Sequence, residues 1–209
     1  MTFRPLPANE PATSGPGRRP GAPAGASGHR ALLLAGILFV LLLAAVATFA
    51  PAVRGEEAAA REYQVKAAFI LNFAKFIDWP AGTPAEGGFT ICTLGSDPFN
   101  EAFDSLRTKT IKGKPVTVRH LARVEDLRQC QILFIGSSER KHLPAIVKVS
   151  RESRALTVSE VDGFCQAGGG INLVTEKSKV VFEINAKATQ QAGLKVSAQL
   201  LKLARMVIE

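Results

Sequence analysis

Residues 31–50, ALLLAGILFVLLLAAVATFA, form an uninterrupted uncharged run that separates a leader from the part of the chain that can fold in water. Arginines precede the run, and Ala50 and Ala52 at its end have the A-x-A spacing of a signal-peptidase site. We therefore predict a secretory signal peptide, with its apolar and cleavage regions in residues 31–55, and a periplasmic protein. The alternative is an uncleaved inner-membrane anchor, because a run of this length can span a bilayer.

Residues 1–30 are rich in Pro, Gly, Ala and Ser and have no periodic apolar residues, so we expect this n-region to be disordered. The whole chain has a net charge of +8, and removal of residues 1–55 leaves +4. The remaining lysines are scattered, which argues against nucleic-acid binding.

The aromatic stretch EYQVKAAFILNFAKFIDWP, residues 62–80, contains the only Trp and the only Tyr of the chain. Apolar residues recur in it at every third or fourth position, which predicts an amphipathic helix over residues 61–78 that Pro80 helps to end. Lys66 and Lys75 fall outside the apolar stripe and exclude a bilayer span. We expect the stripe to pack against a sheet; its residues are Val65, Phe69, Phe73, Phe76 and Ile77.

Strand and helix patterns then alternate. FTICTLG (89–95) predicts a strand, followed by a helix with Ser96 or Asp97 as N-cap and Pro98 in its first turn. KPVTVRHL (114–121) alternates apolar and polar residues, as a half-exposed strand does.

CQILFIG (130–136) is apolar almost throughout and predicts a strand buried on both faces, followed by a helix through about Ser150. Two further strand-like runs, 171–174 and 179–185, follow a glycine-rich segment. A closing helix is predicted from the stripe Leu194, Ala198, Leu201, Ala204 and Ile208. The predicted fold is α/β, a single layered domain over residues 61–208 with a mixed β-sheet flanked by helices and a C-terminal helix.

Three cysteines lie in the mature chain. Cys92 and Cys130 fall on two strands that are expected to be adjacent, so in an oxidising compartment we favour a disulfide between them; the alternative is two buried thiols. Cys165 lies among glycines in a loop that we expect to be exposed. It is either a redox-responsive thiol, a mixed-disulfide site or simply tolerated.

Two loops at strand ends, 95–99 and 136–140, offer hydroxyls and backbone N–H groups at one edge of an α/β sheet. They are candidate anion-binding loops through Ser96, Asp97, Gly136 and Ser137, and the alternative is that they only cap their helices. The sequence has no P-loop, H-E-x-x-H, C-x-x-C or G-x-S-x-G motif, and we expect no catalytic residues, metal or cofactor.

Five runs resemble the YfiR family of exported proteins, over residues 61–208: YQVKAAFILNFAKFIDWP, FTICTLGSDPF, CQILFIGSSE, ALTVSEVDGFCQAGGGINLV and VVFEINAKATQQAGLKVSAQLLKLARMV. The resemblance implies a periplasmic α/β protein that binds the periplasmic domain of an inner-membrane diguanylate cyclase and holds it inactive. Release, for example through capture by an outer-membrane lipoprotein, raises cyclic diguanylate and promotes biofilm formation.

The resemblance also implies a disulfide between Cys92 and Cys130. A second disulfide of the best understood member lies in the glycine-rich loop, where this chain has only Cys165, so redox sensing through that bond is not expected to carry over.

For a partner surface we select Phe164, Ile171 and Glu183, because the first two are apolar beside glycines and the third interrupts an apolar strand, where its charge must face solvent or a partner. The alternative is that Phe164 and Ile171 are core residues and Glu183 is solvated. A second functional hypothesis is a periplasmic small-ligand sensor that acts on another membrane receptor, such as a histidine kinase. A β-rich edge also allows a homodimer.

Overall fold

The computed structural model describes residues 27–81, 88–99 and 101–209, and in the first helix it leaves out the side chains of residues 27–31 and 40–55. The predicted disorder of the N-terminal segment therefore falls almost entirely outside the described residues.

The chain divides into two units, Met1–Pro51 and Ala52–Glu209. In the first unit the described backbone is helical from Ser27, where helix α1 (Ser27–Phe76) begins. The large apolar side chains described there, within residues 32–39, are exposed. No helix in the described part of the chain has both the length and the apolar character that crossing a membrane requires. Cleavage of a signal peptide stays a prediction.

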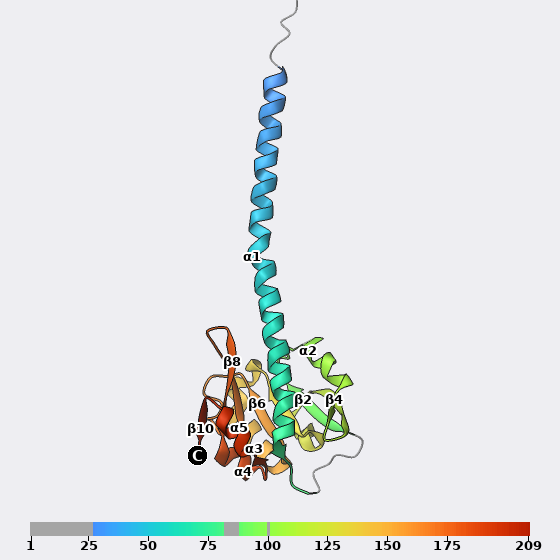
Figure 1. The fold of residues 1–209 in the computed structure, drawn as a ribbon, viewed down its shortest axis with the longest axis vertical. Coiled ribbons are helices and arrows are strands. Elements are labelled where there is room, and N and C mark those ends of the chain that lie inside the picture. The colour runs from blue at the N-terminus through green and yellow to red at the C-terminus, as the bar shows by residue number, and fades with distance from the viewer. Residues whose placement is uncertain (1–26, 82–87, 100) are drawn as a thin grey trace, which may run out of the picture. The chain divides into compact units, whose positions relative to one another are not determined.

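Within the described residues, the second unit is built on an eight-stranded mixed sheet (Figure 1). Its strands are β2 (Phe89–Leu94), β3 (Thr110–Ile111), β4 (Lys114–Leu121), β5 (Ile132–Ile135), β6 (Leu156–Ser159), β7 (Ile171–Glu176), β8 (Lys179–Asn185) and β10 (Met206–Ile208). They lie in the order β10-β8-β7-β6-β5-β2-β4-β3. Five neighbouring strands are parallel, namely β4, β2, β5, β6 and β7. Strand β3 pairs antiparallel with β4, and β8 pairs antiparallel with β7. The predicted fold class is confirmed.

Helices cover both faces of this sheet. Besides α1 they are α2 (Glu101–Asp104), η1 (Ser105–Thr108), η2 (Val124–Gln129), η3 (Ser137–His142), α3 (Leu143–Ser153), α4 (Ala186–Gln191) and α5 (Ala198–Leu203), where η marks a 3-10 helix. On the buried strand β5, Ile132 and Phe134 join the core cluster that contains α1, and Leu133 and Ile135 join the cluster that contains α3. Because successive side chains of a strand point to opposite faces, α1 and α3 pack on opposite sides of the sheet.

The aromatic stretch forms the last turns of α1, as predicted, but its buried stripe is shifted. Ala67, Ile70, Phe73 and Ala74 are buried at spacings of three and four, whereas Val65, predicted as core, is 45% exposed. The helix ends at Phe76, and the next two residues form strand β1 (Ile77–Asp78), which pairs with β9 (Lys195–Val196). Val65 lies outside this buried stripe, one position before the buried Lys66.

The helix after β2 starts later than predicted. Asp97 does not cap it; the Asp97 side chain instead accepts a hydrogen bond from the amide of Phe99, and the first regular turn begins at Glu101. The aromatic ring of Phe99 is buried against Phe103 and Phe134, so this residue belongs to the core rather than to a loop surface. After β5, the predicted helix is found, with 3-10 geometry up to His142.

The prediction of a single C-terminal helix from an apolar stripe is wrong, because the segment forms α4, β9 and α5. Helix α4 ends near Gly193, which has φ of +77°, and Ser197 then caps a separate short helix, α5, by accepting a hydrogen bond from the amide of Leu200. Of the predicted stripe, Leu194 is buried but Ala198 is exposed. The interruption lets the chain pair with β1 and then return to the sheet edge as β10.

Candidate functional site

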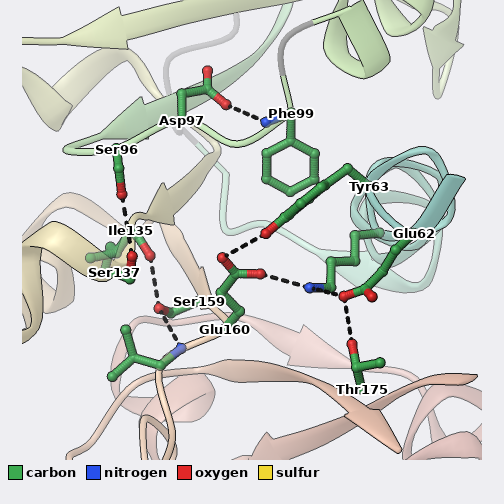
Figure 2. Close-up of polar contacts among 12 residues, drawn as sticks. Glu62, Tyr63, Ser96, Asp97, Phe99, Ile135, Ser137, Ser159, Glu160 and Thr175 are labelled. Atoms are coloured by element: carbon green, nitrogen blue, oxygen red, sulfur yellow. Dashed lines mark hydrogen bonds and ion pairs between the residues drawn. The ribbon is translucent and has the colours of Figure 1, made fainter. Parts of the chain in front are cut away.

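The carboxyl edge of the parallel strands contains a topological switch point. Strand β2 is flanked by β4 on one side and β5 on the other, so the connections that leave β2 and β5 diverge there. The two predicted anion-binding loops do meet at this edge: the amide of Ser96 donates to Ser138 Oγ at 2.9 Å, and the hydroxyls of Ser96 and Ser137 are 3.5 Å apart (Figure 2). A Cβ on Gly136 would collide with the backbone of Ser96, so glycine is required for this approach.

The contacts at the two loops satisfy the groups that an anion would need. The Ser96 amide already has Ser138 as its acceptor, and the Asp97 carboxylate turns back to the amide of Phe99. Glu139 brings a further carboxylate, because Ser138 Oγ lies 3.4 Å from its Oε1. The four predicted residues are thus brought together, and anion binding by them stays a prediction.

An ion cluster of one buried lysine and two glutamates joins α1 to the loop after β6 (Figure 2). Lys66 is only 4% exposed, and its Nζ lies 2.6 Å from Glu62 Oε1 and 2.7 Å from Glu160 Oε2. The Tyr63 hydroxyl donates to the other oxygen of Glu160 at 3.3 Å, and Thr175 Oγ1 donates to Glu62 Oε1 at 2.7 Å. The cluster therefore ties α1 to the loop after β6 and to strand β7.

The charges of the cluster stabilise one another. Burial by itself lowers the pKa of Lys66, but the hydrogen bonds and negative charges of Glu160 and Glu62 outweigh it and raise the pKa. Burial likewise raises the pKa of Glu62, yet its hydrogen bonds from Lys66 and Thr175 and the charge of Lys66 leave it lowered. Burial and the negative charge of Glu160 raise the pKa of Tyr63, so its hydroxyl remains a donor. Both shifts in the Lys66–Glu62 pair favour the charged form of each side chain.

This cluster was not found from the sequence, where Lys66 was assigned to the polar side of the helix. One local signal was available: Glu62 precedes Lys66 by four residues, the spacing of a helical ion pair. The decisive partner, Glu160, lies 94 residues further along the chain.

The residues predicted for a partner surface are buried. Phe164 and Ile171 are core residues, which is the alternative stated for them. The expectation that Glu183 faces solvent or a partner is wrong: it is 4% exposed and forms an ion pair with Arg205, which also pairs with Glu176. A charge inside strand β8 is tolerated because an arginine of the C-terminal segment neutralises it. Partner binding through these residues stays a prediction, and it would require them to be uncovered.

Cys92 and Cys130 form a disulfide, with their Cα atoms 5.9 Å apart. It joins the central strand β2 to the residue that follows η2, two positions before β5 begins. Cys165 is buried rather than exposed, and its pKa is raised to about 12, mainly by burial and then by the charge of Glu183. A thiol with this pKa is protonated at neutral pH, which argues against a reactive role.

The described residues contain no group of three or more His, Cys, Asp or Glu side chains that could hold a metal ion. His120 contacts the Thr93 hydroxyl, and His142 contacts Glu139, so each histidine has a local polar partner.

Together these features define a class of protein: a disulfide-linked α/β domain with helices on both faces of a largely parallel sheet and a buried ion cluster at the carboxyl edge. A family model described as YfiR/HmsC-like matches residues 63–205, and the chain belongs to this family. The resemblance seen in the sequence is thereby confirmed.

Several solved structures resemble part of the chain. One is the ABC domain in complex with L-Trp from Streptococcus pneumonia, with 14% identity, a TM-score of 0.44 and coverage of 60% of this chain and 57% of that chain. A conserved domain protein from Vibrio cholerae has 8% identity, a TM-score of 0.42 and coverage of 60% and 56%. The ligand-free, open structure of a substrate-binding protein with adhesive properties from Clostridium difficile has 11% identity, a TM-score of 0.42 and coverage of 59% and 56%. The chain thus spans somewhat more than half the length of these proteins, and similarities of this size carry no argument about its function.

Proposed function

We propose that this protein is a periplasmic regulator that binds a membrane-bound diguanylate cyclase and inhibits it. The observation that carries the proposal is the YfiR/HmsC-like match over residues 63–205, which spans almost the whole second unit. Proteins of this family are periplasmic and regulatory, and they act on a membrane signalling protein rather than on a substrate. The apolar run before the domain supports export, because it has the order of a secretory signal.

The stability of the domain also fits a role outside the cytoplasm. A disulfide on the central strand persists in an oxidising compartment, whereas cytosolic thiols are kept reduced. The burial and raised pKa of Cys165 fit a stable scaffold in which this thiol takes no part in disulfide exchange.

The test is deletion of the gene in its own species, followed by complementation with the full chain. We expect deletion to raise cellular cyclic diguanylate and surface attachment, and complementation to restore both. The tagged protein, crosslinked in cells, should copurify with a transmembrane protein that has a diguanylate cyclase domain. Unchanged cyclic diguanylate after deletion, with no cyclase among the crosslinked proteins, would reject the proposal.

A small-ligand sensor is the second candidate, and the topological switch point favours it, since α/β sheets bind ligands at such edges. It ranks lower because the amide of Ser96 already bonds to Ser138. A thermal-shift screen of the purified protein with phosphates, nucleotides and amino acids tests it, and binding should disappear when Ser96 and Ser137 are replaced by alanine.

A further inference from the structure

An open groove of about 1050 Å³ lies between α1 and the β7–β8 hairpin. Because the groove is open to solvent rather than enclosed, it suits a segment of polypeptide better than a metabolite, which needs a pocket that buries most of its surface. Its apolar surface comes from Val65, which is 45% exposed, and from the half-buried Val180. Ala58 and Ala59 add small side chains on the α1 side, which allow a second helix to approach closely.

The hairpin that forms the other wall has an unusual turn. Glu176 pairs with Lys179, so Lys177 and Ser178 are the two turn residues, and their φ values are +48° and +62°. Turns of this type normally use Gly or Asn, because other side chains are strained at positive φ. Strain of this kind is retained where a particular geometry is needed, and here it produces a tight turn that presents a lysine on each side of Ser178.

Of the charged side chains that line the groove, Lys179 is the one without an ion-pair partner among the described residues, and Lys177 lies beside it in the turn. Glu57 and Arg61 pair with each other at 2.7 Å, and Glu62 is held by Lys66. Among the residues that the structure describes, no carboxylate lies within ion-pair distance of Lys177 or Lys179. A complementary occupant therefore carries acidic side chains on the flank that faces the hairpin.

We infer that this groove receives an acidic amphipathic helix from the periplasmic domain of the membrane protein that the chain regulates. The inference rests on the proposed function for the origin of the helix. An apolar ridge of the helix packs on Val65 and Val180, and its acidic flank faces Lys179, an arrangement that reuses the helix-in-groove mode of recognition. Val65 is thus exposed in the free protein because its partner surface comes from another chain.

The test places a photo-crosslinking amino acid, p-benzoylphenylalanine, at position 65 of the full chain in cells of its own species. The matched control carries it at Val207, which is also exposed but lies on edge strand β10. We expect an adduct with a membrane protein at position 65 and none at 207, and mass spectrometry should locate it in a peptide rich in Asp and Glu. Lys179→Glu should reduce the adduct at least about tenfold, because like charges repel, whereas Lys202→Glu on α5 should leave it unchanged.

The outcomes separate the two proposals. If position 65 forms an adduct but deletion of the gene leaves cyclic diguanylate unchanged, the groove is retained as a binding site and the cyclase is rejected as its partner. A response to deletion without an adduct at 65 would retain the cyclase and refute the groove. An adduct that persists with Lys179→Glu, or that maps to a peptide without acidic residues, would refute the acidic helix. Thermal denaturation of each variant verifies that it is folded.

Discussion

Replacement of Lys66 by methionine tests whether the buried cluster holds α1 to the sheet. Methionine keeps the length and most of the volume of the side chain but leaves Glu160 and Glu62 without their cation. Removal of one partner of a buried ion pair costs about 3–5 kcal/mol of unfolding free energy. The Glu62 side chain is 33% exposed and can be hydrated, so we expect the lower end of the range, about 3 kcal/mol.

In a domain of this size, that loss corresponds to a decrease of about 6–12 °C in Tm, measured by circular dichroism or calorimetry. Urea unfolding gives the free energy directly, and an unchanged m value shows that the denatured state is not altered. Lys75→Met is the matched control: this lysine lies on the same helix but is exposed, with Asn72 as its hydrogen-bond partner, and its loss should cost less than about 0.5 kcal/mol.

The pH dependence of the difference supplies a second readout. The pKa of Glu62 is lowered in the folded state, so its contribution is present above the ordinary value of 4.5 and is lost as the pH falls through the folded pKa. The pKa of Lys66 is raised, so its contribution is constant at neutral pH and is lost only when the pH rises through the folded value. The difference between wild type and Lys66→Met should therefore shrink as the pH decreases below about 4.5.

A double-mutant cycle identifies the partner. Lys66→Met combined with Glu160→Gln should cost less than the sum of the single changes, with a coupling energy of about 2 kcal/mol. A loss below about 1 kcal/mol for Lys66→Met, or purely additive effects, would refute the view that this lysine is buried between the two carboxylates.

Three further changes follow from the described contacts. Replacement of Cys92 and Cys130 by alanine should lower the free energy of unfolding by about 4 kcal/mol, because the disulfide closes a loop with a sequence separation of 38. Reduction of the wild type should lower the free energy of unfolding by a similar amount. Cys165, with its pKa of about 12, should resist iodoacetamide at pH 8 in the native protein and react rapidly in urea, and rapid native labelling would contradict its burial. Gly136→Ala should lower the urea midpoint, because the added methyl group meets the backbone of Ser96, and an unchanged midpoint would show that the two loops separate easily.

The sheet was predictable because its strands carry their own signal. Strand β5 is buried on both faces and reads as a continuous apolar run, and β4 alternates as a half-exposed strand does. The order of these strands with intervening helices fixes the α/β class before any contact is known. The location of the disulfide followed in the same way, from two cysteines in runs that predict neighbouring strands, although Cys130 lies just before β5.

The ion cluster and the C-terminal segment depend on contacts that a linear pattern does not contain. The burial of Lys66 is stable only because Glu160, far along the chain, supplies a carboxylate. The C-terminal stripe had helical spacing, yet Gly193 and the capping residue Ser197 interrupt it so that the chain can reach two sheets. The burial of Glu183 was missed for the same reason, because Arg205, which neutralises its carboxylate, lies outside strand β8.

The pairing of β1 with β9 has a consequence for the order of events during synthesis. Ile77 faces Val196 across this ladder, and the amide of Ser197 donates to the carbonyl of Phe76. The end of α1 therefore gains these partners only after residues 195–197 have been made, and contacts of such high sequence separation slow folding. Under the proposed export, slow folding is an advantage, because the polypeptide remains extended long enough to be translocated before strand β9 completes the pairing with β1.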